Sequence, residues 1–429
     1  MKIFKFGGAS VKDAAAVRNV AKILSLFEQE QLVVVISAMG KTTNALEAVM
    51  KSYWNKDGKT NELIDQIRAY HLAIESDLFA KTDHPVSEEI STIFNSLKEK
   101  CKGNASENFH FEYDQIISLG EVISTKIIAG WLKEQKYPCA WLDARNVIRT
   151  TNRWRDANII WDKTEEHVNQ KVQQFIQDGQ RIIITQGFIG STAEGFTTTL
   201  GREGSDFTAA ILAYTLNAKD VTIWKDVPGM LNADPKYFDN TVLLEKISFH
   251  EAIELAYYGA SVIHPKTIQP LKRKNIPLYV KSFLDPYAKG SVIQASEDFD
   301  ANIPSFIFKM NQVLISLTPK DYSFIVEENL QSIFSYLSQE NIRIHLMQNS
   351  AVSFSFCVDA EKVDLKKLYD HFTIHYLVKY NEGLELVTIR HYDQPTIERV
   401  TVDKEIYLEQ KSRHTARIVM KDISDQKRQ

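Results

Sequence analysis

The stretch KFGGASV (residues 5–11) places a lysine directly before a glycine pair. A glycine turn beside a cationic side chain is typical of phosphate sites, because glycine lets backbone amides approach the phosphate oxygens. The order differs from that of a P-loop, in which the lysine follows the glycines. The opening stretch therefore indicates a phosphate site and raises the question of what a lysine before the glycines does there.

A second polar stretch, ISAMGKTTNAL (residues 36–46), follows an apolar run. Gly40, Lys41 and Thr42 resemble the end of a P-loop, but Val35 occupies the position of that motif's first glycine. We interpret the stretch as a hydroxyl-rich loop at the end of a strand, where open α/β sheets bind ligands.

Two further stretches carry charge at the expected start of a helix. Glu121 in SLGEVIST is either a ligand contact or a charge that complements the helix dipole. TLGREGSDFTAAILA (residues 199–213) presents Arg202, Ser205 and Asp206 before an apolar helix. That helix start is either an anion site or a plain N-cap formed by Ser205 or Asp206.

The elements that must position these residues follow an α/β rhythm. The apolar runs QLVVVISAMG, RIIITQGFIG, VTIWKDV and PLYVKSF are typical of buried strands, and helical patterns separate them. Residues 46–111 are mostly helical in pattern, and Ser248 with Glu251 forms a capping box. The fold class predicted for residues 1–295 is therefore a mostly parallel sheet sandwiched by helices.

The pattern changes at Asn311. Strand-like runs near 311–317, 352–358 and 384–392 alternate with helical patterns near 330–337 and 363–372. With one further strand, this gives the β-α-β-β-α-β order of a ferredoxin-like α+β unit, which is typical of small ligand-sensing modules. We expect a regulatory region over residues 305–429, with residues 393–422 forming either the remnant of a second module or a completing hairpin.

Composition narrows the possible partners. Among 429 residues, 51 lysines and arginines against 55 acids give a formal charge of −4, which favours neither a nucleic-acid nor a membrane surface. The three cysteines are far apart, so neither a disulfide framework nor a zinc site is expected. The N-terminal lysines lead straight into a strand pattern, so we expect no secretory signal and a cytoplasmic location.

Taken together and in order, the motifs resemble those of aspartate kinases, a family with C-terminal ACT modules of the ferredoxin-like kind. The resemblance extends over the whole chain, and it is carried by KFGGASV, SAMGKTTN, SLGE, TLGREGSDFTAA, IWKDVPGMLNADP and YYGASVIHP. It implies transfer of the ATP γ-phosphoryl group to the β-carboxylate of L-aspartate, with Mg²⁺ accompanying the nucleotide and no metal held by the protein alone. It also implies the first step of lysine, threonine and methionine synthesis.

The resemblance assigns roles residue by residue. Lys5 and Asp206 would be catalytic, with Lys5 stabilising the transferring group and Asp206 orienting it. Glu121 would receive the substrate ammonium, and Arg202 would hold a carboxylate with help from hydroxyl groups. The substrate-binding set implied is Ser37, Thr43, Glu121, Arg202 and Ser205. The nucleotide-binding set implied is Lys5, Gly7, Gly8, Ser10, Lys225, Asp226, Leu231, Lys236, Ser261 and Val262.

Several positions depart from the family pattern. Ala9 stands where threonine is usual, and Glu203 where glycine is usual. Lys225 and Leu231 replace a threonine and a tyrosine, and Ser261 occupies a position that is often lysine and reaches the phosphates. Either this phosphate contact is weaker or Lys225 replaces it. His264, beside Pro265, is interpreted as structural.

The C-terminal region also departs from its relatives. His345 stands where lysine-sensitive members carry an aspartate that grips the effector amine, so lysine feedback is not expected to be ordinary. The region is expected to bind an amino-acid effector or to form the surface of a homodimer or higher oligomer. Two alternatives stay open: another kinase of the same fold, such as glutamate kinase, and a non-catalytic amino-acid sensor.

Overall fold

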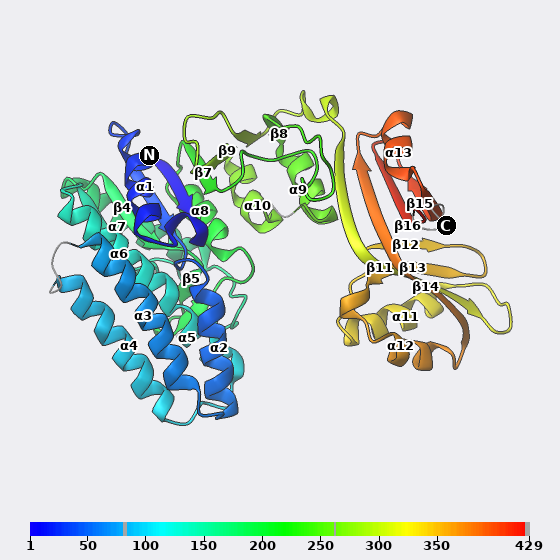
Figure 1. Ribbon diagram of the computed structural model, residues 1–429, viewed down its shortest axis with the longest axis horizontal. Helices are drawn as coiled ribbons and strands as arrows, with labels where there is room; N and C mark the ends of the chain where they lie inside the picture. The colour runs from blue at the N-terminus through cyan, green and yellow to red at the C-terminus, as the bar shows by residue number, and fades with distance from the viewer. Residues whose placement is uncertain (80–83, 261–262, 425–429) are drawn as a thin grey trace. The chain divides into compact units, whose positions relative to one another are not determined.

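The computed structural model describes residues 1–79, 84–260 and 263–424 (Figure 1). Its internal contacts divide the chain into two compact units. The first unit consists of Met1–Met230, Leu243–Ile253 and Val262–Glu297. The second consists of Leu231–Val242, Glu254–Ser261 and Asp298–Gln429, so two short segments from earlier in the chain belong to it.

The first unit is built around an eight-stranded sheet in which, among the described strands, all neighbours except β9 and β10 run parallel. The central strands are buried on both faces, which explains their continuous apolar runs. In sheet order the strands are β3 (Cys139–Leu142), β4 (Ile182–Gln186), β2 (Leu32–Ile36), β1 (Lys2–Phe6), β7 (Asp220–Lys225), β9 (Leu278–Ser282), β10 (Ser291–Gln294) and β8 (Lys246–Ser248). A two-stranded ribbon, β5 (Ile189–Ser191) and β6 (Thr197–Thr199), lies outside this sheet.

Helices connect the strands of this unit. They are α1 (Ala14–Ser25), α2 (Thr42–Asn55), α3 (Thr60–Leu78), α4 (Pro85–Lys102), α5 (Phe109–Ile117), α6 (Leu119–Glu134), α7 (Trp161–Gln177), α8 (Gly204–Thr215), α9 (Phe249–Tyr258) and α10 (Pro265–Lys274). Two short 3-10 helices, η1 (Gly8–Val11) and η2 (Ala144–Asn146), follow strand ends. The first residues of α9 belong to the first unit and its last residues to the second.

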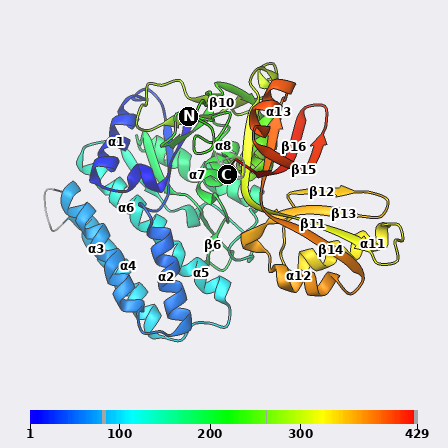
Figure 2. The ribbon, with the colours of Figure 1, turned by 45° about the vertical axis from the view of Figure 1, so that its right-hand side comes forward.

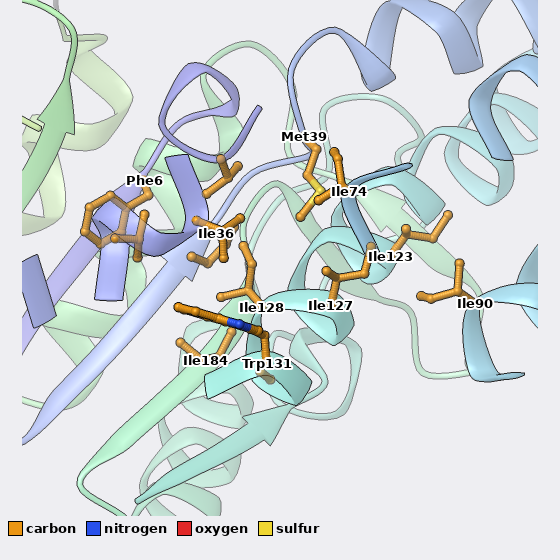
Figure 3. Close-up of a cluster of buried hydrophobic side chains, with 14 of the residues drawn as sticks. Phe6, Ile36, Met39, Ile74, Ile90, Ile123, Ile127, Ile128, Trp131 and Ile184 are labelled. Carbon is orange, nitrogen blue, oxygen red and sulfur yellow. The ribbon is translucent and has the colours of Figure 1, made fainter. Parts of the chain in front are cut away.

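The main core lies between one face of the sheet and a layer of helices that includes α6 (Figure 3). Ile127 and Ile128 of α6 are fully buried, and Ile128 packs toward Ile36 of β2 and Ile184 of β4. Helix α8 packs against the same sheet through β1 and β7 and has a separate apolar contact with the loop near Ala157. The sheet is therefore sandwiched, and the predicted fold class is confirmed.

Local signals in the sequence explain several boundaries. One of the two hydrogen bonds of the predicted capping box is present at α9, where the Glu251 amide donates to the Ser248 hydroxyl at 2.9 Å. His264 precedes Pro265 and caps α10, because its ring nitrogen accepts from the Lys266 amide at 3.1 Å. The structural interpretation of His264 is therefore confirmed.

The second unit contains a six-stranded antiparallel sheet (Figure 2). In sheet order its strands are β12 (Leu346–Asn349), β13 (Phe354–Asp359), β11 (Ser305–Pro319), β14 (Tyr376–Arg390), β16 (Thr415–Asp422) and β15 (Lys404–Lys411). Its helices are η3 (Asp300–Asn302), α11 (Glu327–Gln339), η4 (Ala360–Lys362), α12 (Leu365–Phe372) and α13 (Gln394–Thr401). Apart from the short η helices, the chain order from β11 to β14 is the predicted β-α-β-β-α-β pattern.

The C-terminal residues extend this sheet. Strands β15 and β16 form a hairpin that pairs with β14, and both the remnant of a second module and a completing hairpin stay open as interpretations. Helix α13, which the sequence pattern did not predict, packs Ile397 and Val400 against β14 and β16. None of the helices in the described ranges is long and apolar enough to cross a membrane.

Candidate active site

The charged stretches singled out in the sequence converge on one cavity of the first unit, with a volume of about 450 Å³. Eight of the predicted site residues line it, from five separate parts of the chain. They are Lys5, Ser37, Thr43, Glu121, Arg202, Ser205, Asp206 and Lys225. Lys5 and Arg202, which are 197 positions apart in the sequence, thus face the same space.

Strand alternation explains why Lys5 reaches this cavity. In β1, Phe4 and Phe6 face the core that contains α6, so Lys5 points to the opposite face, on which α8 packs. Lys5 pairs with Val35 of β2 and Ile223 of β7, both fully buried. A lysine amid these apolar neighbours is only 8% exposed, and such a charge needs a partner.

The partner is Asp206 in the first turn of α8. Lys5 Nζ lies 2.6 Å from Asp206 Oδ1, and Lys225 Nζ lies 3.7 Å from Asp206 Oδ2. Because β1 and β7 are neighbours, one buried carboxylate can orient both lysines. The cavity wall therefore carries two ammonium groups fixed by a single aspartate.

The start of α8 corrects one alternative drawn from the sequence. The N-cap position is Glu203, without a side-chain cap hydrogen bond, and the helix begins at Gly204. Neither Ser205 nor Asp206 is the N-cap, so both side chains are available to the cavity. The sequence pattern suggested a cap because serine and aspartate favour that position, but the helix begins two residues earlier than a Ser205 cap requires and three earlier than an Asp206 cap.

Gly8 is required for a reason that the sequence did not reveal. The Gly40 amide donates to the Gly8 carbonyl at 3.0 Å, which joins the turn after β1 to the loop after β2. A Cβ at Gly8 would lie 2.7 Å from the Gly40 carbonyl oxygen and 2.8 Å from that of Ala38. The missing side chain thus permits loop packing that positions the cavity residues Ser37 and Thr43.

Glu121 lies in the first turn of α6 and is 3% exposed. Its Oε1 accepts from the Ala38 amide at 3.3 Å, while its buried Oε2 has no hydrogen-bond partner among the described residues. Burial raises the pKa of this carboxyl to about 8, although the Ala38 amide and the charge of Lys5 act in the opposite direction. A buried carboxylate with an unused oxygen in a cavity wall is suited to receive a ligand's cationic group.

The sequence did not identify Arg155 and Tyr113, which also line the cavity. The Arg155 guanidinium lies 4.2 Å from the centre of the Tyr113 ring. The buried carboxylate of Asp114 fixes this wall, because it accepts from the Arg155 amide and from both the amide and hydroxyl of Thr199. Burial raises the pKa of Asp114 to about 6 despite these hydrogen bonds. The stretch RTTNRWRDAN has no hydrophobic period, and nothing in it indicates which arginine faces a ligand.

Three non-glycine residues of the cavity wall adopt left-handed backbone conformations: Arg155 (φ 66°), Phe188 (φ 71°) and Glu203 (φ 54°). This conformation costs an L-residue on the order of 1–2 kcal/mol. It explains why glycine is usual at position 203 in the family that the sequence resembles. Strained backbone that collects around one cavity is typical of functional sites.

The remaining predicted nucleotide-binding residues that the structure describes are not part of the cavity lining. Ser10 is buried in η1 and donates to the Trp224 carbonyl at 3.5 Å, so it joins the turn to β7. Gly7 precedes η1, and the position of its Cβ would be 3.4 Å from Lys5 Nζ. Asp226 is exposed, directly after β7. Leu231 and Lys236 belong to the segment Leu231–Val242 of the second unit, and Ser261 and Val262 lie outside the described residues.

The chemistry of the cavity residues fits a metal that arrives with its ligand. Among the described residues, no group of three or more histidine, cysteine, aspartate and glutamate side chains could hold a metal ion. The cavity nevertheless contains the carboxylates of Glu203 and Asp206, and a buried oxygen of Glu203 has no hydrogen-bond partner in the described part of the chain. Mg²⁺ is commonly bound through one or two carboxylates together with substrate phosphates.

Comparison with known proteins gives consistent results. Residues 1–282 match the model of the amino acid kinase family. The chain is 33% identical to the lysine-sensitive aspartokinase 3 of Escherichia coli over 361 residues, which cover 83% of this chain and 78% of that protein. It is 32% identical to the chloroplastic aspartokinase 3 of Arabidopsis thaliana over 386 residues, 86% of this chain and 66% of the relative.

Solved structures agree with these sequence relatives. E. coli aspartokinase III in complex with lysine and aspartate superimposes with a TM-score of 0.83 at 29% identity, covering 98% of this chain and 95% of that one. The same enzyme in complex with aspartate and ADP gives a TM-score of 0.79, with 100% and 97% covered. The fold, the cavity and the sequence relatives together establish that this chain belongs to the aspartokinases of the amino acid kinase family.

Proposed function

We propose that this chain transfers the γ-phosphoryl group of ATP to the β-carboxylate of L-aspartate, producing 4-phospho-L-aspartate and ADP. The observation that carries the proposal is the shared cavity of Lys5, Glu121 and Arg202. It combines cationic groups for two anionic reactants with a carboxylate for an ammonium group. Each reactant alone could be held by fewer charges, but bringing two anions together requires more than one cationic group in the cavity.

The amino-acid substrate engages three kinds of group. The ammonium binds Glu121, whose second carboxylate oxygen is unused in the described structure. Arg202, exposed in the cavity wall, holds a carboxylate in a bidentate pair. The hydroxyls of Ser37, Thr43 and Ser205 complete the contacts. A substrate without the amine would leave Glu121 unpaired, which gives specificity.

The phosphates engage the lysines. Lys5 stabilises the charge that spreads over the transferring group, and Asp206 holds Lys5 in position through their 2.6 Å ion pair. Lys225 shares the same aspartate, so it is suited to replace the phosphate-contacting lysine that the family often carries at position 261. The backbone amides of Gly7 and Gly8 approach the phosphates from the turn after β1. Bound Mg²⁺, held by phosphate oxygens with Asp206 and Glu203, would add positive charge there.

The acceptor needs no general base. A free β-carboxylate has a pKa of about 4 and is ionised at neutral pH. Asp206 therefore acts as an orienting group, and its position between two lysines is consistent with that role. Positioning and electrostatic stabilisation provide the catalysis, as is general for phosphoryl transfer.

The second unit has a regulatory role in this proposal. Its β-α-β-β-α-β order, continued by the β15–β16 hairpin, is consistent with an ACT-type region over residues 305–429. His345 is half-buried, its Nδ1 lies 2.7 Å from Gln312 Oε1, and burial beside Lys309 lowers its pKa to about 4. A neutral ring of this kind cannot replace a carboxylate as the partner of a lysine ammonium. Feedback by lysine is therefore expected to be weak, and homodimerisation through this region stays a prediction.

A hydroxamate trapping assay tests the activity, because hydroxylamine converts an acyl phosphate into a coloured hydroxamate. The purified chain is supplied with ATP, Mg²⁺ and either L-aspartate or L-glutamate, with and without added lysine, threonine or methionine. We expect product with L-aspartate and none with L-glutamate. Product only with glutamate would favour glutamate kinase, and no product from a folded protein that binds aspartate would favour a sensor.

A further inference from the structure

The two edge strands of the six-stranded sheet in the second unit approach each other. Gln410 of β15 donates through Nε2 to the Met347 carbonyl of β12 at 2.6 Å. Arg417 of β16 donates to the carbonyl of His345, directly before β12. Strands at opposite ends of the sheet order are thereby joined, and both ends of the sheet lie in the same part of the unit (Figure 2).

A cavity of about 530 Å³ lies at this junction, and we call it the β12–β15 cavity. Its wall is predominantly polar and also contains a carboxylate and an ammonium group; it is formed by Tyr258, Gln348, Glu409, Gln410, Lys411, Ser412, Thr415 and Arg417. All of these residues belong to the second unit, so the cavity is separate from the one described above. Its volume lies within the usual range for a small-molecule site.

Arg417 is the distinctive charge in this wall. Its Nη2 donates to the His345 carbonyl, its guanidinium lies 5.1 Å from the centre of the Tyr258 ring, and its buried Nε has no acceptor among the described residues. The neighbouring charges are already matched. Glu409 and Lys411 form an ion pair at 2.9 Å, and Arg390 contacts Glu254 at 3.4 Å. Within the described ranges, no carboxylate lies within ion-pair distance of Arg417.

A second cation lies close to the same wall. A Cβ at Gly259, next to Tyr258, would lie 2.9 Å from Lys309 Cε, so the lysine stem passes directly over this glycine. Lys309 forms no ion pair in the described part of the chain. Burial, together with the charges of Arg343 and Arg417, lowers the pKa of Lys309 to about 8, with Asp359 acting weakly in the opposite direction.

Unmatched cations in a half-buried position cost free energy, since a charge removed from water needs a counter-charge. His345 does not provide one, because an imidazole is either neutral or positively charged; burial keeps this ring neutral near pH 7. A bound anion would supply the missing counter-charge at Arg417, because the planar guanidinium matches carboxylate and phosphate oxygens. The hydroxyl groups of Tyr258, Ser412 and Thr415 and the amide of Gln348 would supply further hydrogen bonds.

We propose that the β12–β15 cavity binds a small anion that carries a carboxylate or phosphate group, with Arg417 as its principal contact. The site is independent of the proposed kinase reaction, since it shares no residue with the catalytic cavity. It is also unlike a site for lysine, because the local charge is positive. The ligand class follows from the unmatched donor of Arg417, and Lys309, which does not line the cavity, adds positive charge nearby.

Thermal unfolding of the full chain tests this proposal. Inorganic phosphate and malonate are titrated separately at constant ionic strength set by sodium chloride, and calorimetric titration gives the affinity. We expect a saturable rise in unfolding temperature with at least one anion, and the stronger response identifies phosphate or carboxylate as the preferred group. Because phosphate could also enter the catalytic cavity, the response is repeated with Lys5→Ala, in which it should persist.

Three variants locate the site. Arg417→Gln is expected to weaken binding at least tenfold, while Arg413→Gln, which changes an exposed arginine of the same hairpin, should bind as the parent does. If Arg417→Gln does not fold, Lys309→Met is the second variant that tests the site. Removal of this buried charge should raise the unfolding temperature without anion and reduce the anion response. An equal response in the parent and in Arg417→Gln or Lys309→Met, or no saturable response at all, would overturn the proposal.

Discussion

Glu121 offers the sharpest test of the proposed substrate site, because its ionisation is coupled to both binding and folding. Its carboxyl is 3% exposed, and its pKa is raised by burial from 4.5 to about 8. Only the ionised form pairs well with the substrate ammonium. About a tenth of the protein carries that form at pH 7 and about nine-tenths at pH 9. The KM for aspartate should therefore fall about tenfold between these pH values.

The same pKa determines a stability profile. An acid whose pKa is higher in the folded state binds more protons there, so stability falls as pH rises from about 4.5 to about 8. Once the Glu121 carboxyl is ionised, the free energy of unfolding is lower by at most about 5 kcal/mol. Glu121→Gln removes this loss, because the amide does not ionise. We expect this variant to be more stable than the parent at pH 9 and little different below pH 5, as measured by urea unfolding.

The same substitution that stabilises the fold should weaken the binding of aspartate. Glu121→Gln loses the charge-assisted pair with the ammonium, so the KM for aspartate should rise about tenfold or more, while the KM for ATP changes little. In this variant the KM for aspartate should no longer depend on pH between 7 and 9. ADP release followed by a coupled assay at each pH provides the measurement.

Glu75→Gln is a matched control. Glu75 is also 3% exposed, lies in α3 outside the cavity lining, and has a pKa raised by burial. This variant should change the stability profile in the same direction without affecting the KM for aspartate. If KM in the parent is independent of pH, or if Glu121→Gln retains the parent's pH dependence, the assigned role of Glu121 is wrong.

Three other substitutions test separate parts of the site. Lys5→Ala should lower kcat roughly 10²–10³-fold while the protein stays folded by circular dichroism; near-normal turnover would refute its role in charge stabilisation. Glu203→Gly relieves a left-handed backbone (φ 54°) and removes a half-buried carboxylate beside Arg202, one oxygen of which is buried, so it should stabilise the fold by about 1 kcal/mol and lower the KM for aspartate. A lower unfolding temperature would contradict this. Gly8→Ala forces a Cβ against the Ala38 and Gly40 carbonyls and should destabilise by about 1–3 kcal/mol with reduced kcat; unchanged stability would mean that the two loops are not packed as described.

The sequence by itself determined the main elements and the main charged groups of this protein. Its continuous apolar runs predicted buried parallel strands, since strands covered on both faces have no polar side. Its glycine-flanked polar stretches predicted where ligands would bind, because the ends of parallel strands share one edge of the sheet. These are properties of local pattern and of order along the chain.

Only the tertiary structure decided which groups meet and why some residues are required. The ion pairs of Asp206 with both Lys5 and Lys225 depend on the neighbouring positions of β1 and β7, which are far apart in sequence. The contribution of Arg155 depends on the buried Asp114 that fixes its backbone, and no pattern in the sequence indicates it. The raised pKa of Glu121 likewise arises from burial by distant segments. Contacts, burial and pKa depend on long-range packing, which a local sequence pattern does not contain.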